Sequence, residues 1–151
     1  MMRYQNLKKY HFVLEPRYYF YGWKPEPHII ARLPAIQALC HARKYLPKGY
    51  NFKIWDAYRT HRVRVLMLQS FTRRLKILYP KNVCAMIVKY AGRNLRSSKT
   101  VLRLGTHRNG GAFDLTIVNR RGEELYMGTD HDDLTDKAAL WYYEKKRNSW
   151  Q

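Results

Sequence analysis

Residues 50–60 read YNFKIWDAYRT, and this stretch joins two different hydrophobic periods. Over 50–54 apolar and polar side chains alternate, which is the period of a half-buried strand. From residue 60 onward apolar residues recur every three or four positions as far as Leu78, and Pro80 follows. That spacing predicts a helix over 60–78. The junction between the strand and the helix carries two charged side chains, Asp56 and Arg59.

Hydrophobic periodicity and the positions of Gly and Pro also predict the other elements of the chain. Before the loop or weak strand over 93–104 we expect an extended aromatic arm over 13–27 and helices over 34–45 and 82–90. After it we expect a strand over 113–118, a turn over 119–122, a partner strand around 125–126, and a last helix from 132 or 133 to 143. Neither a repeat nor a low-complexity linker divides the sequence, so we expect one domain over 1–151. The order of elements predicts an α+β fold, with helices packed on a small, mainly antiparallel sheet.

The composition is strongly basic. Lys and Arg number 29 against 11 Asp and Glu, which gives a net charge of +18, and 46% of the residues are hydrophobic. This apolar content excludes a disordered tail. The charge would suit nucleic acid, an anionic polymer such as a cell envelope, or an acidic substrate, but the basic residues are scattered and follow no known nucleic-acid motif. Neither a membrane-spanning stretch nor a signal peptide is evident, so we expect a cytoplasmic protein.

Two clusters carry residue types that suit catalysis. His107 lies in a glycine-rich loop, and Asp114 follows seven positions later on the predicted strand 113–118. An imidazole nitrogen and a carboxylate oxygen are both good zinc ligands, although a loop histidine alone is more often a surface or core residue. Arg59 could direct its guanidinium at a carboxylate or a developing oxyanion. Taken alone, it would more often pair with Asp56 or Asp114 for structural reasons.

Three motifs together resemble the D-alanyl-D-alanine dipeptidases, zinc peptidases of the vancomycin-resistance type. The family patterns are Asp-Ala-Tyr-Arg-Pro, Ser-x-His-x-x-Gly-x-Ala-x-Asp-Leu-Thr and Met-Gly-Thr-x-Phe-Asp. The corresponding segments here are 56–60 (DAYRT), 105–116 (GTHRNGGAFDLT) and 127–132 (MGTDHD). They occur in the same order and span most of the chain.

The resemblance implies a role for each matching residue. His107 and Asp114 correspond to zinc ligands, and Arg59 corresponds to the residue that stabilises the transition state. Asp132 and Tyr58 correspond to substrate-binding positions, with Asp132 holding the ammonium end of the dipeptide. The implied activity is zinc-dependent hydrolysis of D-alanyl-D-alanine or a related peptidoglycan-type peptide. A non-catalytic relative that binds cell-wall peptides, and a basic nucleic-acid-binding domain, are the alternatives.

The sequence departs from the family at several positions. Gly105 replaces the serine of the second motif, and His131 replaces the phenylalanine of the third, where it could serve as a substitute ligand. The family takes its third zinc ligand, a histidine, and its general base, a glutamate, from a later motif. After Asp132 this sequence contains no histidine, and Glu144 is its only glutamate there. We therefore expect that the chain lacks the C-terminal segment of the family and that its activity is impaired.

Overall fold

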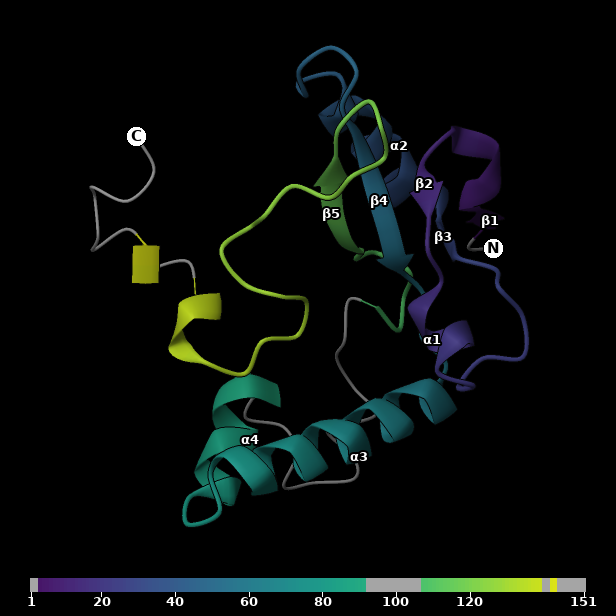
Figure 1. Cartoon of the computed structure of the whole chain (residues 1–151). Coiled ribbons are helices and arrows are strands. Elements are labelled where there is room, and N and C mark those ends of the chain that lie inside the picture. Colours follow the sequence, from purple (N-terminus) through teal and green to yellow (C-terminus); the bar gives the residue numbers. More distant parts are fainter. Residues whose placement is uncertain (1–2, 92–106, 140–141, 144–151) are drawn as a thin grey trace.

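The computed structural model describes residues 3–91, 107–139 and 142–143. In chain order the elements are β1 (Tyr4–Asn6), a 3₁₀ helix (Leu7–Tyr10), β2 (Val13–Leu14), α1 (Arg17–Phe20), β3 (Ile30–Arg32), α2 (Leu33–Arg43), β4 (Asn51–Asp56), α3 (His61–Leu78), α4 (Val83–Ala91), β5 (Asp114–Val118) and a second 3₁₀ helix (Asp136–Ala138). This mixture of helices and small sheets confirms the predicted α+β class. Figure 1 shows the strands above and α3 below them, so the carboxyl end of β4 faces α3.

Two small sheets organise the described residues. The first has three strands in the order β2-β4-β5, with β4 in the centre. β5 pairs with β4 in antiparallel orientation, whereas β2 pairs with it in parallel. The second sheet is the antiparallel pair of β1 and β3. The aromatic arm predicted over 13–27 therefore contributes the edge strand β2 and the short helix α1, instead of lying on the domain as an irregular segment.

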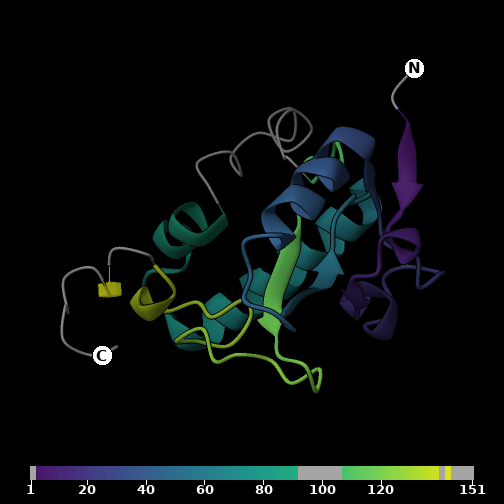
Figure 2. The same cartoon turned by 90° about the horizontal axis from the view of Figure 1, so that it is seen from above.

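The main core lies between α2 and the central strand. Ile36 and Leu39 of α2 and Phe52 and Ile54 of β4 belong to one buried cluster, and Figure 2 shows α2 lying along the sheet. Burial of side chains of this size stabilises the fold by about 1.5–3 kcal/mol each. Because both β2 and β5 hydrogen-bond to β4, this packing also fixes the two strands that flank it.

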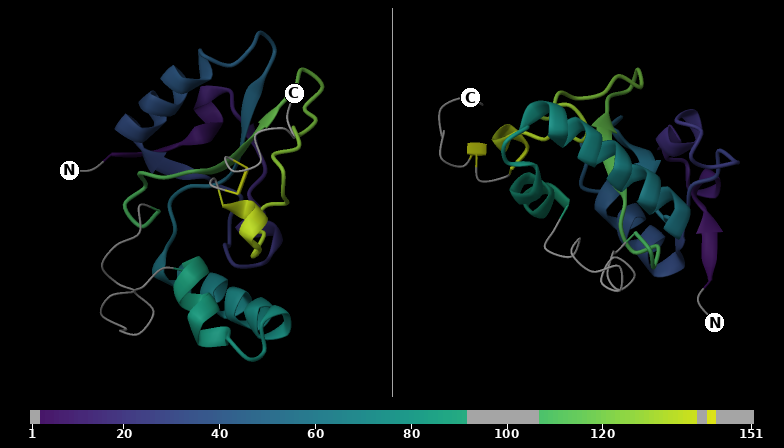
Figure 3. Two further views of the ribbon diagram at one scale, coloured as in Figure 1. Left: turned by 90° about the vertical axis from the view of Figure 1, so that its left-hand side faces the viewer. Right: turned by 90° about the horizontal axis from the view of Figure 1, so that it is seen from below.

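Helices α3 and α4 form a separate layer below the end of the sheet (Figure 3). Thr60 caps α3, since its hydroxyl accepts a hydrogen bond from the backbone N–H of Val63 at 3.4 Å. Val63 and Leu75 are buried on the inner side of the helix. The hydroxyl of Tyr79 donates to the carbonyl of Leu134 at 2.9 Å, which ties the segment after β5 to this layer.

Of the elements predicted after β5, the turn over 119–122 is present, since Gly122 N donates to Asn119 O at 2.9 Å, but the partner strand and the last helix are wrong. Residues 125–126 form no strand, because pairing beyond β5 is limited to one bridge between Val118 and Glu124 and the hydrogen bond from Leu125 N to Ile117 O. The last helix does not begin at Asp132, since the backbone of Asp132 is left-handed with φ 58°. The Asp133 carboxylate accepts from Thr135 N at 2.6 Å, and this local turn competes with helix formation.

The predicted segment 93–104 lies outside the described residues. Of the helices in the described part of the chain, none combines the length and the apolar character that a membrane span needs.

The central strand should dominate stability. Ile54 is fully buried, so Ile54→Ala should lower the free energy of unfolding by about 2–5 kcal/mol, because the lost burial adds to the cost of the cavity. Ile77 is 80% exposed, and Ile77→Ala is the matched control, with an expected change within about 0.5 kcal/mol. Urea denaturation followed by circular dichroism measures both. Equal losses in the two variants would contradict this account of the core.

Candidate metal and substrate site

A bulge in the sheet places two carboxylates opposite each other. The register of β4 against β5 shifts between Ile54 and Asp56, so that Asp56 faces Asp114. An extra residue of this kind bends a strand and re-aims its side chains. Like charges directly opposite each other across a strand pair destabilise it unless a cation lies between them. The end of the sheet that faces α3 therefore needs positive charge.

Arg59 supplies that charge. Its Nε donates to Asp56 Oδ2 at 2.8 Å, and its NH2 group forms an ion pair with the carboxylate of Asp114. Lys24, from the segment after α1, binds the other oxygen of Asp56 at 2.5 Å and the carbonyl of Tyr58 at 3.2 Å. Asp56 is only 2% exposed, so water screens these contacts weakly. Two cations thus neutralise two carboxylates, of which Asp56 is almost fully buried and Asp114 is partly exposed.

His107 completes the cluster, and its ring orientation is fixed by the backbone. Its Nδ1 lies 2.7 Å from the carbonyl of Ala57, which can only accept, so Nδ1 carries the proton. Burial, and after it the charge of Arg59, lowers the pKa of His107 below its ordinary value, which favours a neutral ring. The lone pair of Nε2 then faces Asp114 Oδ1 at 3.2 Å.

This arrangement fits a metal ion. With a neutral ring, two acceptor atoms face each other without a proton between them, and a cation relieves that repulsion. Two ligands of one tetrahedral zinc with bonds of about 2.0–2.1 Å lie about 3.3 Å apart. The hydrogen bond from Nδ1 to a carbonyl is the outer contact that metal-bound histidines typically make. The donor types and their separation therefore both suit zinc.

Asp56 is the third member of this group. Among the described residues, ligand atoms of Asp56, His107 and Asp114 all lie within 4.8 Å of one another. Both oxygens of Asp56 already bind cations, however, through Lys24 and Arg59. The carboxylate of Asp56 thus positions Arg59 in this structure, whereas Asp114 and His107 present atoms to a shared point.

The loop that carries His107 is held by backbone contacts to β3 and to the junction between β4 and α3. Arg32 N donates to Gly110 O at 2.9 Å, and Arg59 N donates to His107 O at 3.0 Å. Gly110 has φ +68°, and a Cβ there would lie 2.7 Å from Cε1 of Tyr4. Only glycine adopts this left-handed conformation without strain and without displacing the ring of Tyr4, which explains why the loop needs that residue.

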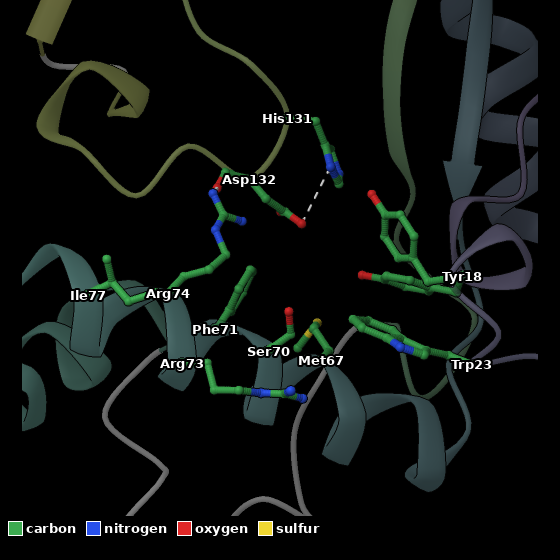
Figure 4. Close-up of a pocket in the computed structure, with 11 residues that line it drawn as sticks. Tyr18, Trp23, Met67, Ser70, Phe71, Arg73, Arg74, Ile77, His131 and Asp132 are labelled. Atoms are coloured by element: carbon green, nitrogen blue, oxygen red, sulfur yellow. Dashed lines mark hydrogen bonds and ion pairs between the residues drawn. The ribbon is translucent and has the colours of Figure 1, made fainter.

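A cavity of about 580 Å³ adjoins Arg59. Tyr18 and Met67 line it, and both contact Arg59: the guanidinium lies 5.0 Å from the centre of the Tyr18 ring, and NH1 lies 3.2 Å from the Met67 sulfur. Asp132 also lines this cavity and directs its carboxylate into it (Figure 4). Asp132 Oδ2 lies 3.4 Å from Nδ1 of the neighbouring His131.

His131 and Tyr58 have packing partners outside the metal cluster. The ring of His131 packs edge-on against Trp55 at 4.4 Å, and burial lowers its pKa. His131 therefore lies between Trp55 and Asp132, not in the group of ligand atoms found among the described residues. The ring of Tyr58 packs against Tyr4 at 5.1 Å, and Tyr58 does not line the cavity beside Arg59.

The structure thus brings together His107, Asp114 and Arg59, with Asp132 in the adjoining cavity. Both structural partners considered for Arg59 from sequence are present at once. Lys24 and Tyr18 also belong to the site but were not predicted, because they lie far from the motifs along the chain. Their one sequence signal is the aromatic and basic character of the arm, which has no recognisable spacing.

Comparison with known proteins agrees with this geometry. The family model Peptidase_M15, described as D-ala-D-ala dipeptidase, matches residues 22–149. The chain therefore belongs to this family of metallopeptidases, whose members usually use zinc. No curated protein matches the sequence.

The buried ion pairs around Asp56 should be essential for stability. Asp56→Asn leaves Lys24 and Arg59 facing a neutral amide, which should lower the free energy of unfolding by about 3–5 kcal/mol. Asp136→Asn removes the carboxylate of an exposed pair with Lys89 and is the matched control, with little change expected. Urea titration of both variants measures the difference. Comparable stability of the two would show that the buried cluster is dispensable.

Proposed function

We propose that this chain is a zinc-dependent peptidase that cleaves D-alanyl-D-alanine or a closely related peptidoglycan-type peptide. We expect its activity to be impaired, because among the described residues no further histidine and no glutamate join the cluster of Asp56, His107 and Asp114. One observation carries the proposal: His107 Nε2 and Oδ1 of Asp114 lie 3.2 Å apart, beside Arg59, which contacts two residues that line the cavity. Membership of the D-ala-D-ala dipeptidase family supports the substrate class. His107 and Asp114 would hold zinc, which polarises a scissile carbonyl and lowers the pKa of its bound water.

The remaining residues divide binding and catalysis between them. Arg59 contacts both Asp114 and the cavity-lining Tyr18, so its guanidinium can donate to the oxygen of a carbonyl held between the two. Asp132 presents a carboxylate that can accept the ammonium end of a peptide. Asp56 and Lys24 hold Arg59 in place, and the aromatic rings of the arm restrict the access of water.

The decisive experiment is an assay of the zinc-loaded chain with D-alanyl-D-alanine. Release of D-alanine that stops on addition of a chelator is the expected result. A chain that binds zinc but cleaves neither the dipeptide nor longer peptides ending in D-alanyl-D-alanine would overturn the proposed activity. Peptide binding that persists without hydrolysis would instead favour the non-catalytic cell-wall-binding alternative.

Zinc affinity should depend on His107. His107→Ala removes the Nε2 donor, and zinc affinity should fall by at least about 100-fold, because even loss of an outer contact to a ligand costs about 10–100-fold. His28→Ala is the matched control, since the side chain of His28 is 57% exposed and pairs with Glu26. Competition of each protein with a fluorescent zinc chelator gives the affinities. Unchanged affinity in His107→Ala would place the metal elsewhere.

Arg59 should contribute to catalysis through the several N–H donors of its planar guanidinium as well as through its charge. Arg59→Lys keeps the charge but cannot bridge Asp56 and Asp114 while donating to a substrate oxygen. The kcat of peptide cleavage should fall by about 10²–10³-fold, which is typical for loss of one oxyanion donor. Arg121→Lys at an exposed pair with Glu123 is the control and should leave kcat unchanged. Equal rates in the two variants would remove Arg59 from the mechanism.

A further inference from the structure

The cavity beside Arg59 opens between two walls that carry exposed apolar side chains (Figure 4). One wall consists of rings from α1 and the residues just after it, and the other is a face of α3. Tyr21 on the first wall is 54% exposed, and Ile77 on the second is 80% exposed. Phe20, which precedes Tyr21 in the chain, is 66% exposed. Single apolar residues are common on protein surfaces, but large ones that border the same opening indicate an interaction surface.

The aromatic wall is held in a fixed arrangement. The rings of Tyr18 and Trp23 stack with centroids 5.2 Å apart, and Tyr21 packs edge-on against Trp23 at 5.3 Å. Trp23 N donates to Tyr18 O at 2.8 Å, which closes the turn that holds the three rings together. Tyrosine and tryptophan combine an apolar ring with a polar end, and both are enriched at the boundary between lipid headgroups and acyl chains.

The opposite wall belongs to a strongly basic helix. α3 contains neither Asp nor Glu, and its Lys and Arg residues are Arg62, Arg64, Arg73, Arg74 and Lys76. Arg73 and Arg74 line the cavity, and the exposed Lys76 directly precedes Ile77. Arg74 donates to the carbonyl of Asp132 at 2.9 Å, and Arg73 donates to the carbonyl of Gln69 at 3.4 Å. Because a carbonyl is neutral, these contacts leave the positive charge of the two guanidinium groups in place.

A partner for this face must match both its apolar side chains and its charge. A second copy of the chain would bury Ile77, but each copy carries a net charge of +18, so the two copies would repel each other. A single-stranded nucleic acid would pair with the arginines and stack on the rings, but it would leave Ile77 in water. An anionic lipid surface accommodates both features, because its headgroups attract arginine and its acyl chains take up apolar side chains.

We propose that the face around the mouth of this cavity, which comprises Tyr21, Trp23, Arg73, Arg74 and Ile77, docks on an anionic lipid surface. Ile77 and the rings enter the boundary between headgroups and acyl chains, while the long arginine side chains keep their guanidinium groups among the lipid phosphates. The mouth of the cavity then faces the lipid. Docking of this kind needs neither zinc nor peptide cleavage, so it goes beyond the proposed function.

The test measures co-sedimentation of the full chain with two kinds of vesicle. One kind is made of phosphatidylcholine alone, and the other also contains phosphatidylserine. Each basic side chain near an anionic surface contributes about fivefold in affinity. Because two arginines contribute, the chain should bind the vesicles with phosphatidylserine at least about 10-fold more tightly, and added salt should weaken this binding. A chelator in every sample excludes an effect of the zinc site.

Substitutions at exposed apolar positions assign the binding to this face. Ile77→Asp should lower the affinity for vesicles with phosphatidylserine by at least about 10-fold, because it removes an inserted side chain and adds a negative charge. Tyr45→Asp is the matched control, since it adds the same charge at a position that is 78% exposed and does not line the cavity. This control should bind almost as well as the unaltered chain. Equal losses in the two variants would overturn the proposal.

The charge of the face is tested separately. Arg73→Gln should lower the affinity for vesicles with phosphatidylserine about fivefold and leave the weak binding to phosphatidylcholine unchanged. Arg121→Gln is the matched control, because it removes the same charge from an exposed pair with Glu123. A loss of equal size in Arg121→Gln would show that net charge alone attracts the lipid, which would contradict docking through this face.

The remaining outcomes concern the other partners. Absence of binding to either kind of vesicle would overturn the proposal. A dimer in sedimentation equilibrium that Ile77→Asp dissociates would do the same, because a second copy would then cover this face. An oligonucleotide whose affinity falls in Ile77→Asp as much as that of the lipid would assign the face to nucleic acid instead. None of these measurements involves peptide cleavage, so failure of docking and failure of the peptidase are distinguishable.

Discussion

The contact between Arg59 and two facing aspartates is the constraint on which the rest of the site depends. The bulge in β4 places Asp56 opposite Asp114, and this arrangement is tolerable only because a guanidinium lies between them. Arg59 reaches this position because it follows the strand directly and precedes the Thr60 cap of α3. The junction between strand and helix thus determines both where the carboxylates point and where the helix begins.

The arm before β3 takes part in the same network. Lys24 binds the buried carboxylate of Asp56, and the ring of Tyr18 lies over Arg59. This arm therefore supplies one of the two positive charges that neutralise Asp56 and Asp114, and it also forms one wall of the cavity. The same few residues of the arm thus pack it against the domain and complete the site around Arg59.

Much of the fold follows from periodicity. The helices over α2, α3 and α4 and the strands β4 and β5 are strongly periodic, and each was predicted within a few residues of its observed bounds. The last helix predicted after β5 was not, since the left-handed Asp132 and the Asp133 turn depend on local hydrogen bonds that periodicity does not report.

Only part of the site could be predicted from the sequence, for a related reason. His107, Asp114 and Arg59 were found because they lie in short motifs, whereas Lys24 and Tyr18 act across long separations in sequence. The apolar stripe of α3 illustrates the same limit. Val63 and Leu75 are buried in the core, but Met67 and Phe71, which share their spacing, line the cavity. Spacing alone cannot tell a residue that faces the core from one that faces a ligand.

The contact of Gly110 with Tyr4 and Arg32 has a consequence for how the domain assembles during synthesis. The ribosome releases β1, β3 and α3 well before it releases the His107 loop and β5. The segments synthesised first can already pack their helices. Until residues 107–114 emerge, however, Asp56 has no carboxylate opposite it, and the ring of Tyr4 cannot pack against Gly110. Closure of the loop over β1 and β3 is therefore a late, long-range step, of the type that slows folding. A nascent chain that is already compact would thus assemble the cluster of His107, Asp114 and Arg59 as its last step.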